Sequence, residues 1–307
     1  MSSPYKPKGI YSAQWIPTDA AGRIDRQALA ALIEFERGHG IHGFLALGST
    51  GEFPQFSVEE RKTALATVME LAGGLPVMAN ITDIRPRAAI ELGRYAKEVG
   101  AVAVGLMPPM FFPVSPADQL AYFLHVAERV DLPVMLYNFP ELTGKRIDLK
   151  VVSDFADRAS MCAIKQSGGE FAYHRELIAL GKEKGFVVMS GADTRLTEVF
   201  ALGAAGAIGG LVNIVPELMV KLYQICVEGQ KGETQAIAET MVEVGRTVDQ
   251  LTFPLNVAAG IEARGFSAGV SKMIVSPESQ AIHRKILGDL RELFAKTHLP
   301  LGPAAHA

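Results

Sequence analysis

Short apolar runs alternate with longer amphipathic stretches through the first three quarters of the chain. The runs are apolar on both faces, which is the pattern of strands in a parallel sheet covered by helices. They recur at intervals of roughly 20 to 35 residues, the length of one strand and helix unit. We predict eight strands, over residues 10–16, 43–47, 77–81, 102–107, 134–138, 162–165, 186–190 and 207–211.

Helical periodicity fills the gaps between these runs, for example over residues 25–39, 57–72, 116–130 and 169–184. Ser57 and Glu60 form the pattern of a capping box, in which each side chain accepts a hydrogen bond from a backbone amide of the first turn. Eight such units close naturally into a (β/α)8 TIM barrel over about residues 9–229. A doubly wound sheet is the competing architecture.

The alternation stops near residue 229. Beyond it, residues 231–250, 254–265 and 277–297 have helical periodicity with no strand between them. No long flexible linker precedes them, so we expect these helices to pack on the barrel or on a partner subunit. The chain is therefore divided into a barrel, residues 1–229, and a C-terminal helical extension, residues 230–307.

The amino-acid composition mainly excludes classes of protein. The chain has 307 residues, of which 49% are hydrophobic and 21% charged, with a net charge of -3, and this profile is typical of a soluble globular protein. A basic patch that would favour nucleic acid is missing. No apolar stretch reaches the roughly 18 residues that span a bilayer, and the amino terminus lacks the apolar segment of a signal peptide. We expect a soluble, unprocessed, cytoplasmic protein without a nucleic-acid or membrane partner.

Cysteine, histidine and glycine usage argues against cofactor chemistry. Cys162 and Cys226 lie in apolar periodic segments and are predicted to be small core residues. The histidines are not grouped with cysteines or carboxylates at metal-ligand spacing. The glycine-rich segment 203–210 lacks the lysine and hydroxyl of a phosphate loop and suits close packing at a pocket floor. We predict neither a metal nor a cofactor.

Polar residues at the predicted strand ends are the candidates for chemistry, because active sites of parallel barrels lie at the carboxyl ends of the strands. Lys165 ends the sixth run and Tyr137 closes the apolar part of the fifth. Burial favours the neutral amine of a lysine, which can attack a ketone and form an imine. The imine is an electron sink for making or breaking a neighbouring carbon–carbon bond. A solvated lysine is the alternative, but the apolar run and the convergent polar neighbours favour catalysis.

Other strand ends supply hydrogen-bonding groups. Tyr137 can shuttle a proton, although a structural, half-buried tyrosine explains the same pattern. Ser49 and Thr50 offer two hydroxyls and successive amides to a carboxylate, although their Gly-Ser-Thr-Gly context is also that of an ordinary turn. Glu52 is interpreted as a buried structural carboxylate or a charge at a helix end.

Three motifs occur in a recognisable order along the chain. They are Gly48-Ser49-Thr50-Gly51-Glu52, Tyr137-Asn138-Phe139-Pro140 and Ile164-Lys165. In this order they resemble the motifs of the dihydrodipicolinate synthase / N-acetylneuraminate lyase family, and the resemblance covers nearly the whole chain. It implies a (β/α)8 barrel with a helical extension, a homotetramer, and a class I aldolase mechanism on pyruvate or a related 2-oxo acid.

The same resemblance implies a role for each matching residue. Lys165 would form the imine, and Tyr137 would be the proton shuttle. Ser49 and Thr50 would bind the carboxylate of the 2-oxo acid. The main-chain carbonyl of Ile208 would lie near the imine.

Three positions depart from the two best-known branches of that family. The synthase branch typically has an arginine for its second substrate where this chain has Leu142. A second tyrosine of the synthase proton relay falls at Phe111, which has no hydroxyl. A serine that the lyase branch uses for the sugar-acid chain corresponds to Gly210. The departures weaken both lysine biosynthesis and sialic acid cleavage as the function.

The sequence therefore favours a pyruvate-dependent lyase that reversibly cleaves a 2-oxo-3-deoxy sugar acid or a similar hydroxy-2-oxo acid. Asp193 and Asn213, which follow the seventh and eighth runs, are predicted to contact the distal hydroxyls. Alternatives are a dihydrodipicolinate synthase that condenses pyruvate with aspartate semialdehyde, and a Schiff-base dehydratase of the same family. A non-catalytic binding protein is a further alternative, against which Lys165 and Tyr137 count.

Overall fold

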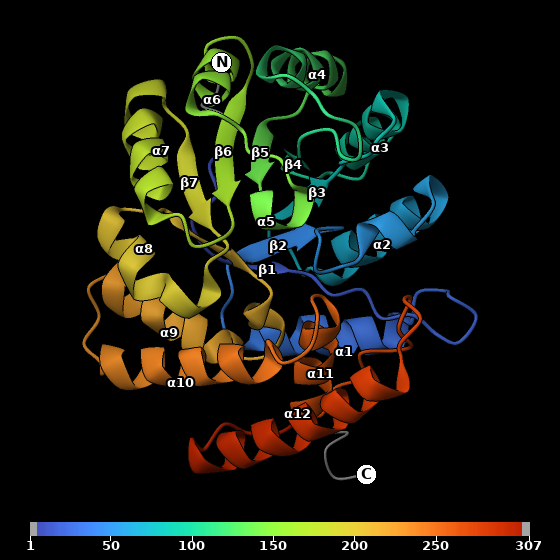
Figure 1. Cartoon of the computed structure of the whole chain (residues 1–307), viewed down its shortest axis with the longest axis vertical. Coiled ribbons are helices and arrows are strands. Elements are labelled where there is room, and N and C mark those ends of the chain that lie inside the picture. The colour runs from blue at the N-terminus through green and yellow to red at the C-terminus, as the bar shows by residue number, and fades with distance from the viewer. Residues whose placement is uncertain (1–4, 303–307) are drawn as a thin grey trace.

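Eight parallel strands close into a barrel in the computed structural model, which describes residues 5–302 (Figure 1). Strands pair in chain order, and β1 pairs with β8 to complete the ring. The predicted (β/α)8 barrel is thus confirmed, and the doubly wound alternative is wrong. The strands are β1 (Gly9–Ala13), β2 (Gly43–Ala46), β3 (Val77–Asn80), β4 (Ala103–Leu106), β5 (Val134–Asn138), β6 (Met161–Gln166), β7 (Val187–Ser190) and β8 (Gly206–Gly209).

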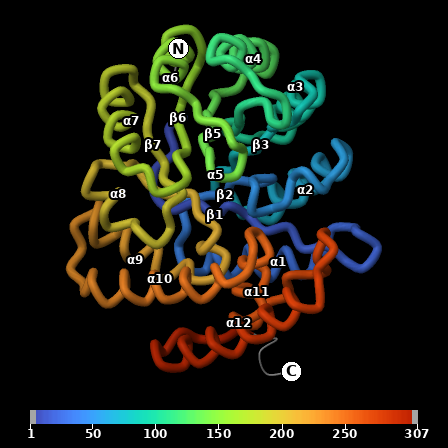
Figure 2. The backbone as a smooth tube through the Cα atoms, viewed as in Figure 1, coloured from blue at the N-terminus to red at the C-terminus, as the bar shows by residue number. Residues whose placement is uncertain are grey.

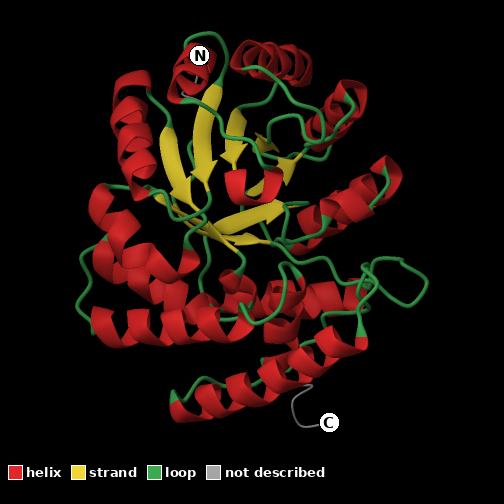
Figure 3. Cartoon of the chain, viewed as in Figure 1, coloured by secondary structure: helices red, strands yellow, loops and turns green. Residues whose placement is uncertain are grey.

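Helices cover the outside of the strands (Figure 3). None in residues 5–302 is both long and apolar enough to cross a membrane. The barrel helices are α1 (Arg26–Gly38), α2 (Val58–Leu71), α3 (Pro86–Glu98), α4 (Pro116–Val130), α5 (Pro140–Thr143), α6 (Leu149–Ala156), α7 (Phe171–Lys184), α8 (Leu196–Leu202) and α9 (Pro216–Cys226). Short 3-10 turns occur at η1 (Phe53–Gln55), η2 (Asp193–Arg195) and η3 (Leu211–Asn213).

Local sequence explains where helix α2 begins. The Ser57 hydroxyl accepts from the Glu60 amide at 3.3 Å, and the Glu60 carboxylate accepts from the Ser57 amide at 2.7 Å. This is the predicted capping box, which satisfies two amides that the first helical turn leaves free.

Two apolar layers make the core. One fills the barrel interior with side chains such as Leu45, Met78 and Ile208, and the other lies between the strands and the helices. Cys162 belongs to the interior layer, as predicted. Cys226 is exposed at the end of α9, so its prediction as a core residue is wrong. The apolar periodicity of that segment continues to its last turn, but the face that carries Cys226 is turned to solvent.

Strands β1 and β8 are shorter than the apolar runs predict. After β1, the backbone amide of Trp15 donates to the Asn213 side chain at 2.9 Å instead of to a neighbouring strand. After β8, the Leu211 amide donates to the Asp193 carboxylate at 2.9 Å and the chain enters η3. Side-chain acceptors therefore replace the strand ladder at the edge where the barrel opens.

The C-terminal segment forms α10 (Thr234–Val248), α11 (Leu255–Ala263) and α12 (Pro277–Lys296), close to the predicted helices. Figure 2 shows α1 beside the orange and red segments that carry α11 and α12. Phe35 on α1 packs against Phe266, with ring centroids 4.5 Å apart. The indole of Trp15 donates to the Ala268 carbonyl at 2.8 Å. The extension thus packs on the barrel, as expected, while the division of the chain at residue 230 stays a prediction.

Candidate active site

Lys165 and Tyr137 lie side by side at the carboxyl ends of β6 and β5. The strand register pairs the two residues directly. The Lys165 Nζ donates to the Tyr137 Oη at 3.1 Å, and the side chains are buried, with 4% and 2% of their surface exposed. The amine also lies 4.3 Å from the centroid of the tyrosine ring. An amine and a phenol are therefore held together in a dry environment, as imine chemistry requires.

A hydroxyl from the loop after β2 extends this contact. The Tyr137 Oη donates to the Ser49 Oγ at 3.5 Å, and Ser49 Oγ in turn donates to the Met107 Sδ at 4.0 Å. Ser49 and Thr50 are both buried. The structure thus brings together the four residues predicted from the motifs: Lys165, Tyr137, Ser49 and Thr50, which we call the inner site.

The inner site opens into a cavity of about 380 Å³, within the range of small-molecule sites. Ile208 also lines this cavity, while the position of its main-chain carbonyl near the imine stays a prediction. Further polar residues that line the cavity come from η2 and from the C-terminal extension. We call these residues the outer wall: Asp193, Thr194, Arg195, Asp249 and Asn256.

Asp193 has one carboxylate oxygen engaged and one free. Its Oδ2 accepts from the Leu211 amide, whereas its Oδ1 is buried without a partner among the described residues. Burial raises the pKa of the carboxyl group to about 6. A Cβ on Gly209 would lie 2.2 Å from that Oδ1, so only glycine allows the carboxylate to lie against β8. This close packing agrees with the prediction made for the glycine-rich segment.

Asn213 does not face the cavity. Its Oδ1 accepts from the Trp15 amide, and its Nδ2 donates to the carbonyls of Ala13 at 3.0 Å and Gly210 at 2.9 Å. The amide is therefore committed to the backbone, where it ties β1 to the chain after β8. The predicted contact between Asn213 and substrate hydroxyls is wrong, because sequence position gives no information on these backbone partners.

Four residues of the outer wall were not predicted: Thr194, Arg195, Asp249 and Asn256. Asp249 follows α10 and is exposed, and Asn256 lies in α11 and is buried. The Asn256 Nδ2 donates to the Asp249 Oδ1 at 3.1 Å. A single amide in the otherwise apolar segment 254–261 was the signal that could have drawn attention to Asn256.

A second buried lysine has a structural role. The Lys272 Nζ donates to the Glu52 Oε2 at 2.7 Å and to the Ile16 carbonyl at 2.8 Å. Burial lowers the pKa of Lys272, and the Glu52 carboxylate opposes this change. Neither residue lines the cavity of Lys165. Glu52 is thus the buried structural carboxylate that the sequence indicated, and its partner comes from the C-terminal extension.

The three departures occupy different environments. Leu142 on α5 is 49% exposed, and Phe111 is 81% exposed with a positive φ of 76°. Neither lines the cavity. Gly210 does line it, and a Cβ there would lie 3.4 Å from Val257 and 3.5 Å from the Thr50 Oγ1. These are ordinary or nearly ordinary contacts, so the cavity has room for the side chain that Gly210 lacks.

Known proteins resemble this chain along most of its length. It matches the Dihydrodipicolinate synthetase family over residues 6–290. The 4-hydroxy-tetrahydrodipicolinate synthase of Pseudomonas putida strain W619 is 30% identical over 277 residues, 90% of this chain and 94% of that protein. YagE of Escherichia coli K12, named as a candidate 2-dehydro-3-deoxy-D-gluconate aldolase, is 34% identical over 229 residues, 73% of this chain and 76% of its own.

Solved structures of known proteins also resemble this chain. The crystal structure of E. coli YagE in complex with pyruvate superposes with a TM-score of 0.86 at 30% identity, covering 93% of this chain and 98% of that one. The sialic acid aldolase of Ruminococcus gnavus shares the fold, with a TM-score of 0.84 at 23% identity and coverage of 94% and 98%. With its barrel and its matching residues 6–290, the chain belongs to the dihydrodipicolinate synthetase family of class I aldolases and lyases.

Proposed function

We propose that this protein is a pyruvate-dependent lyase that reversibly cleaves a 2-oxo-3-deoxy sugar acid or a similar hydroxy-2-oxo acid. The observation that carries the proposal is the buried Lys165 amine, 3.1 Å from the Tyr137 phenol and opening into a cavity with a polar outer wall. Resemblance to YagE, whose crystal structure contains pyruvate, supports the same substrate class.

Imine formation follows from the inner site. The hydroxyls of Ser49 and Thr50 donate to the substrate carboxylate, which directs the neighbouring ketone carbon to Lys165. The neutral amine forms a bond to that carbon while the carbonyl electron pair moves to oxygen. Tyr137 relays a proton from nitrogen to this oxygen, which gives a carbinolamine. Tyr137 then donates its own proton to the hydroxyl, so that water leaves and the protonated imine forms.

Cleavage uses the imine as an electron sink. Tyr137, with Ser49 as its hydrogen-bond partner, takes the proton of the hydroxyl on the fourth carbon. The bond between the third and fourth carbons breaks, its electron pair moves toward the imine nitrogen, and an aldehyde leaves. The resulting enamine is protonated on the third carbon, and hydrolysis releases pyruvate and restores the Lys165 amine.

The outer wall favours hydroxyls over a second anion. Its charged members are Asp193, Asp249 and Arg195, and the Arg195 guanidinium is paired with Glu198 at 2.7 Å. Carboxylates accept hydrogen bonds from a polyhydroxy chain, but they repel a substrate carboxylate. This charge distribution supports a sugar-acid substrate rather than aspartate semialdehyde.

Borohydride reduction in the presence of pyruvate tests the covalent step. Mass spectrometry should find a reduced adduct on Lys165, and Lys165→Ala should lose both the adduct and turnover. Lys184→Met is the matched control, because it removes a lysine that pairs with Asp157 and does not line the cavity. An unmodified, fully active wild-type protein after treatment would contradict the proposal.

Substrate identity needs a separate measurement. Release of pyruvate from a panel of 2-oxo-3-deoxy acids is expected, with condensation of pyruvate and aspartate semialdehyde as the comparison. Faster condensation would favour the synthase alternative. Loss of water without release of pyruvate would favour the dehydratase.

Assembly and location are further parts of the proposal. We infer from the family resemblance that the enzyme is a cytoplasmic homotetramer. Light scattering coupled to size exclusion measures the mass of the assembly directly, and a monomer at micromolar concentration would contradict the tetramer. Cell fractionation tests the location.

A further inference from the structure

Leu47 has an unusual backbone conformation immediately before the inner site. Its φ is 59°, in the left-handed region that side chains other than glycine rarely adopt, and the next residues are Gly48 and Ser49. Such conformations persist only where surrounding contacts determine them strongly. The direction in which the Ser49 and Thr50 hydroxyls leave β2 therefore depends on what holds Leu47.

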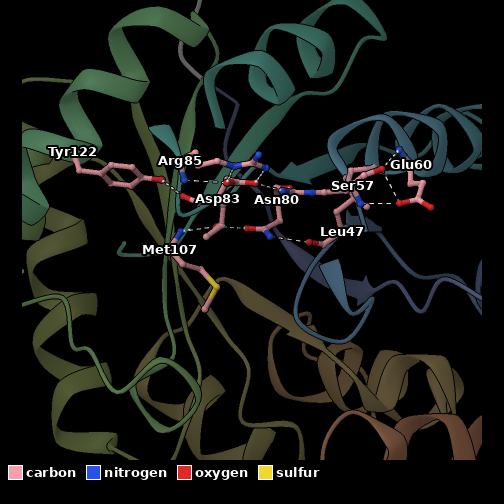
Figure 4. Close-up of polar contacts among 10 residues, drawn as sticks. Leu47, Ser57, Glu60, Asn80, Asp83, Arg85, Met107 and Tyr122 are labelled. Carbon is pink, nitrogen blue, oxygen red and sulfur yellow. Dashed lines mark hydrogen bonds and ion pairs between the residues drawn. The ribbon is translucent and has the colours of Figure 1, made fainter. Parts of the chain in front are cut away.

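Asn80 holds the Leu47 carbonyl. This residue ends β3, is fully buried, and donates from its Nδ2 to the Leu47 oxygen at 2.7 Å (Figure 4). The Thr82 hydroxyl donates to the Asn80 Oδ1 at 2.7 Å, which fixes the orientation of the amide. The Leu47 carbonyl thus accepts a hydrogen bond from the Asn80 amide nitrogen, while the Thr82 hydroxyl holds the oxygen of the same amide.

Thr82 also reaches the inner site by a second path. Its Oγ1 accepts from the Met107 amide at 2.9 Å, at the end of β4. The Met107 sulfur accepts from the Ser49 hydroxyl. Asn80 and Thr82 therefore hold the turn of Ser49 in two ways. Asn80 binds the backbone of the turn at the Leu47 carbonyl, and Thr82 binds Met107, whose sulfur accepts from the Ser49 side chain.

A buried arginine supports the same strand end from outside. The Arg61 guanidinium, 2% exposed, donates to the Asn80 carbonyl at 3.1 Å and pairs with Asp83 at 3.3 Å. Figure 4 labels Asn80, Asp83 and Tyr122, and the Tyr122 hydroxyl donates to the Asp83 carbonyl at 3.2 Å. Arg61 also lies 5.0 Å from the ring centroid of Phe53, which begins η1 just beyond the inner site. Arg61 thus holds the backbone of Asn80 at the end of β3.

We propose that Asn80 and Thr82 are positioning residues that aim the Ser49 and Thr50 hydroxyls at the carboxylate of the 2-oxo acid. The inference rests on the proposed function, because the carboxylate is the group that Ser49 and Thr50 bind there. Neither Asn80 nor Thr82 lines the cavity, so they act through the turn and not through the substrate. Their loss should weaken 2-oxo acid binding more than the chemical step.

Thr82→Val removes the hydroxyl at almost constant volume, and Thr82→Ser keeps it. We expect Thr82→Val to raise the KM for the 2-oxo acid substrate about tenfold, because it removes the two hydrogen bonds of Thr82 to Asn80 and Met107, with a smaller change in kcat. Thr82→Ser should restore the KM. Ser12→Ala is the matched control, because it removes a buried strand hydroxyl that donates to Glu36 at 2.9 Å, away from the cavity.

A purely structural role makes a different prediction. In that case, Thr82→Val and Ser12→Ala would both lower the Tm and leave the KM unchanged, which would overturn the inference. Should Thr82→Val fail to fold, Asn80→Asp keeps the acceptor for Thr82 and loses the donor to Leu47, and a raised KM is again expected. An unchanged KM in this variant would overturn the inference.

Borohydride trapping separates this inference from the proposed function. Wild-type enzyme should be trapped with pyruvate, and half-maximal trapping of Thr82→Val should need about tenfold more pyruvate. If the wild type is not trapped, the proposed function fails. If both proteins are trapped at the same pyruvate concentration, only the positioning role fails.

Discussion

The inner site and the outer wall of the cavity are built in different ways. Lys165 and Tyr137 lie on strands, and hydrogen bonds fix the directions of the Lys165, Tyr137 and Ser49 side chains. The outer wall comes from η2 and from the C-terminal extension, and it contains an exposed Asp249 and an Asp193 Oδ1 that has no partner within residues 5–302. Rigid strand ends suit a reaction common to the family, whereas loops and appended helices can change with the substrate.

The two regions should consequently respond differently to substitution. Changes at the inner site should alter covalent chemistry with pyruvate itself. Changes in the outer wall should leave covalent chemistry with pyruvate unchanged and should alter the binding and cleavage of longer substrates. Pyruvate trapping and substrate cleavage, measured on the same variants, separate these outcomes.

The largest effect is expected at Tyr137. Tyr137→Phe should lower kcat by about 10²- to 10⁴-fold, because it removes the group proposed to relay protons. Tyr173→Phe is the matched control, since its phenol donates to the Ile147 carbonyl outside the cavity. Steady-state cleavage of a 2-oxo-3-deoxy acid measures the effect. Equal activity of the two variants would remove Tyr137 from the mechanism.

The ion pair between the barrel and the C-terminal extension should be measurable as stability. Lys272→Met leaves the Glu52 carboxylate buried without its cation, which should lower the free energy of unfolding by about 3 to 5 kcal/mol. Adding Glu52→Gln removes the uncompensated charge and should recover much of the loss. Urea denaturation of the two single variants and the double variant forms a complete cycle. Additive losses would mean that the pair is not coupled.

Asp193 tests the outer wall directly. Asp193→Asn should lower kcat/KM for sugar acids about tenfold while pyruvate trapping is unchanged, because the carboxylate is a stronger acceptor for hydroxyls than an amide. The wild-type pH profile of kcat/KM should contain a step near the pKa of about 6 that the variant lacks. A step of the same size in both proteins would assign the titration to another group.

The same carboxyl group should influence stability with a definite sign. Its pKa is raised from 3.8 in the unfolded chain to about 6, so folding favours the protonated form. The protonated Asp193 carboxyl group therefore contributes fully to the free energy of unfolding below pH 3.8, and this contribution is lost as the pH rises through 6. Asp193→Asn should consequently be more stable than the wild type at pH 8, and thermal unfolding at several pH values checks this.

The smallest effect is expected at Gly210. A serine fits there by the contacts of its Cβ and adds a hydroxyl to the cavity, so Gly210→Ser should fold normally. It should change the relative KM of short and long sugar acids by less than about tenfold, the scale of one added polar contact. Gly209→Ser is the contrasting variant, because its Cβ would meet the Asp193 carboxylate at 2.2 Å. Identical substrate preference in Gly210→Ser and wild type would show that this position does not select substrate.

The sequence predicts the inner site well for a physical reason. Alternation of apolar runs and amphipathic helices determines where each strand ends, and the barrel brings all the carboxyl ends to one rim. Lys165 and Tyr137 could thus be placed together from the chain alone. The sequence also predicted the capping box that Ser57 and Glu60 form at the start of α2, because this motif depends only on neighbouring residues.

The outer wall could not be predicted in this way. Asn256 reaches the cavity because α11 packs beside η3, a contact between distant segments that leaves no periodic pattern. Asn213 was misplaced because an amide that follows a strand can turn either to substrate or to the backbone. Cys226 was misplaced because periodicity identifies a helix and not which face of its last turn is covered.

The Lys272 and Glu52 pair has a consequence for biosynthesis. Glu52 is translated early, but its lysine leaves the ribosome only after the whole barrel sequence has been made. Until then a lone carboxylate would occupy an interior position, at a cost of several kcal/mol. We therefore expect the barrel to reach its stable form only after Lys272 has left the ribosome. Protease sensitivity of ribosome-stalled chains that end before and after residue 272 would reveal this order.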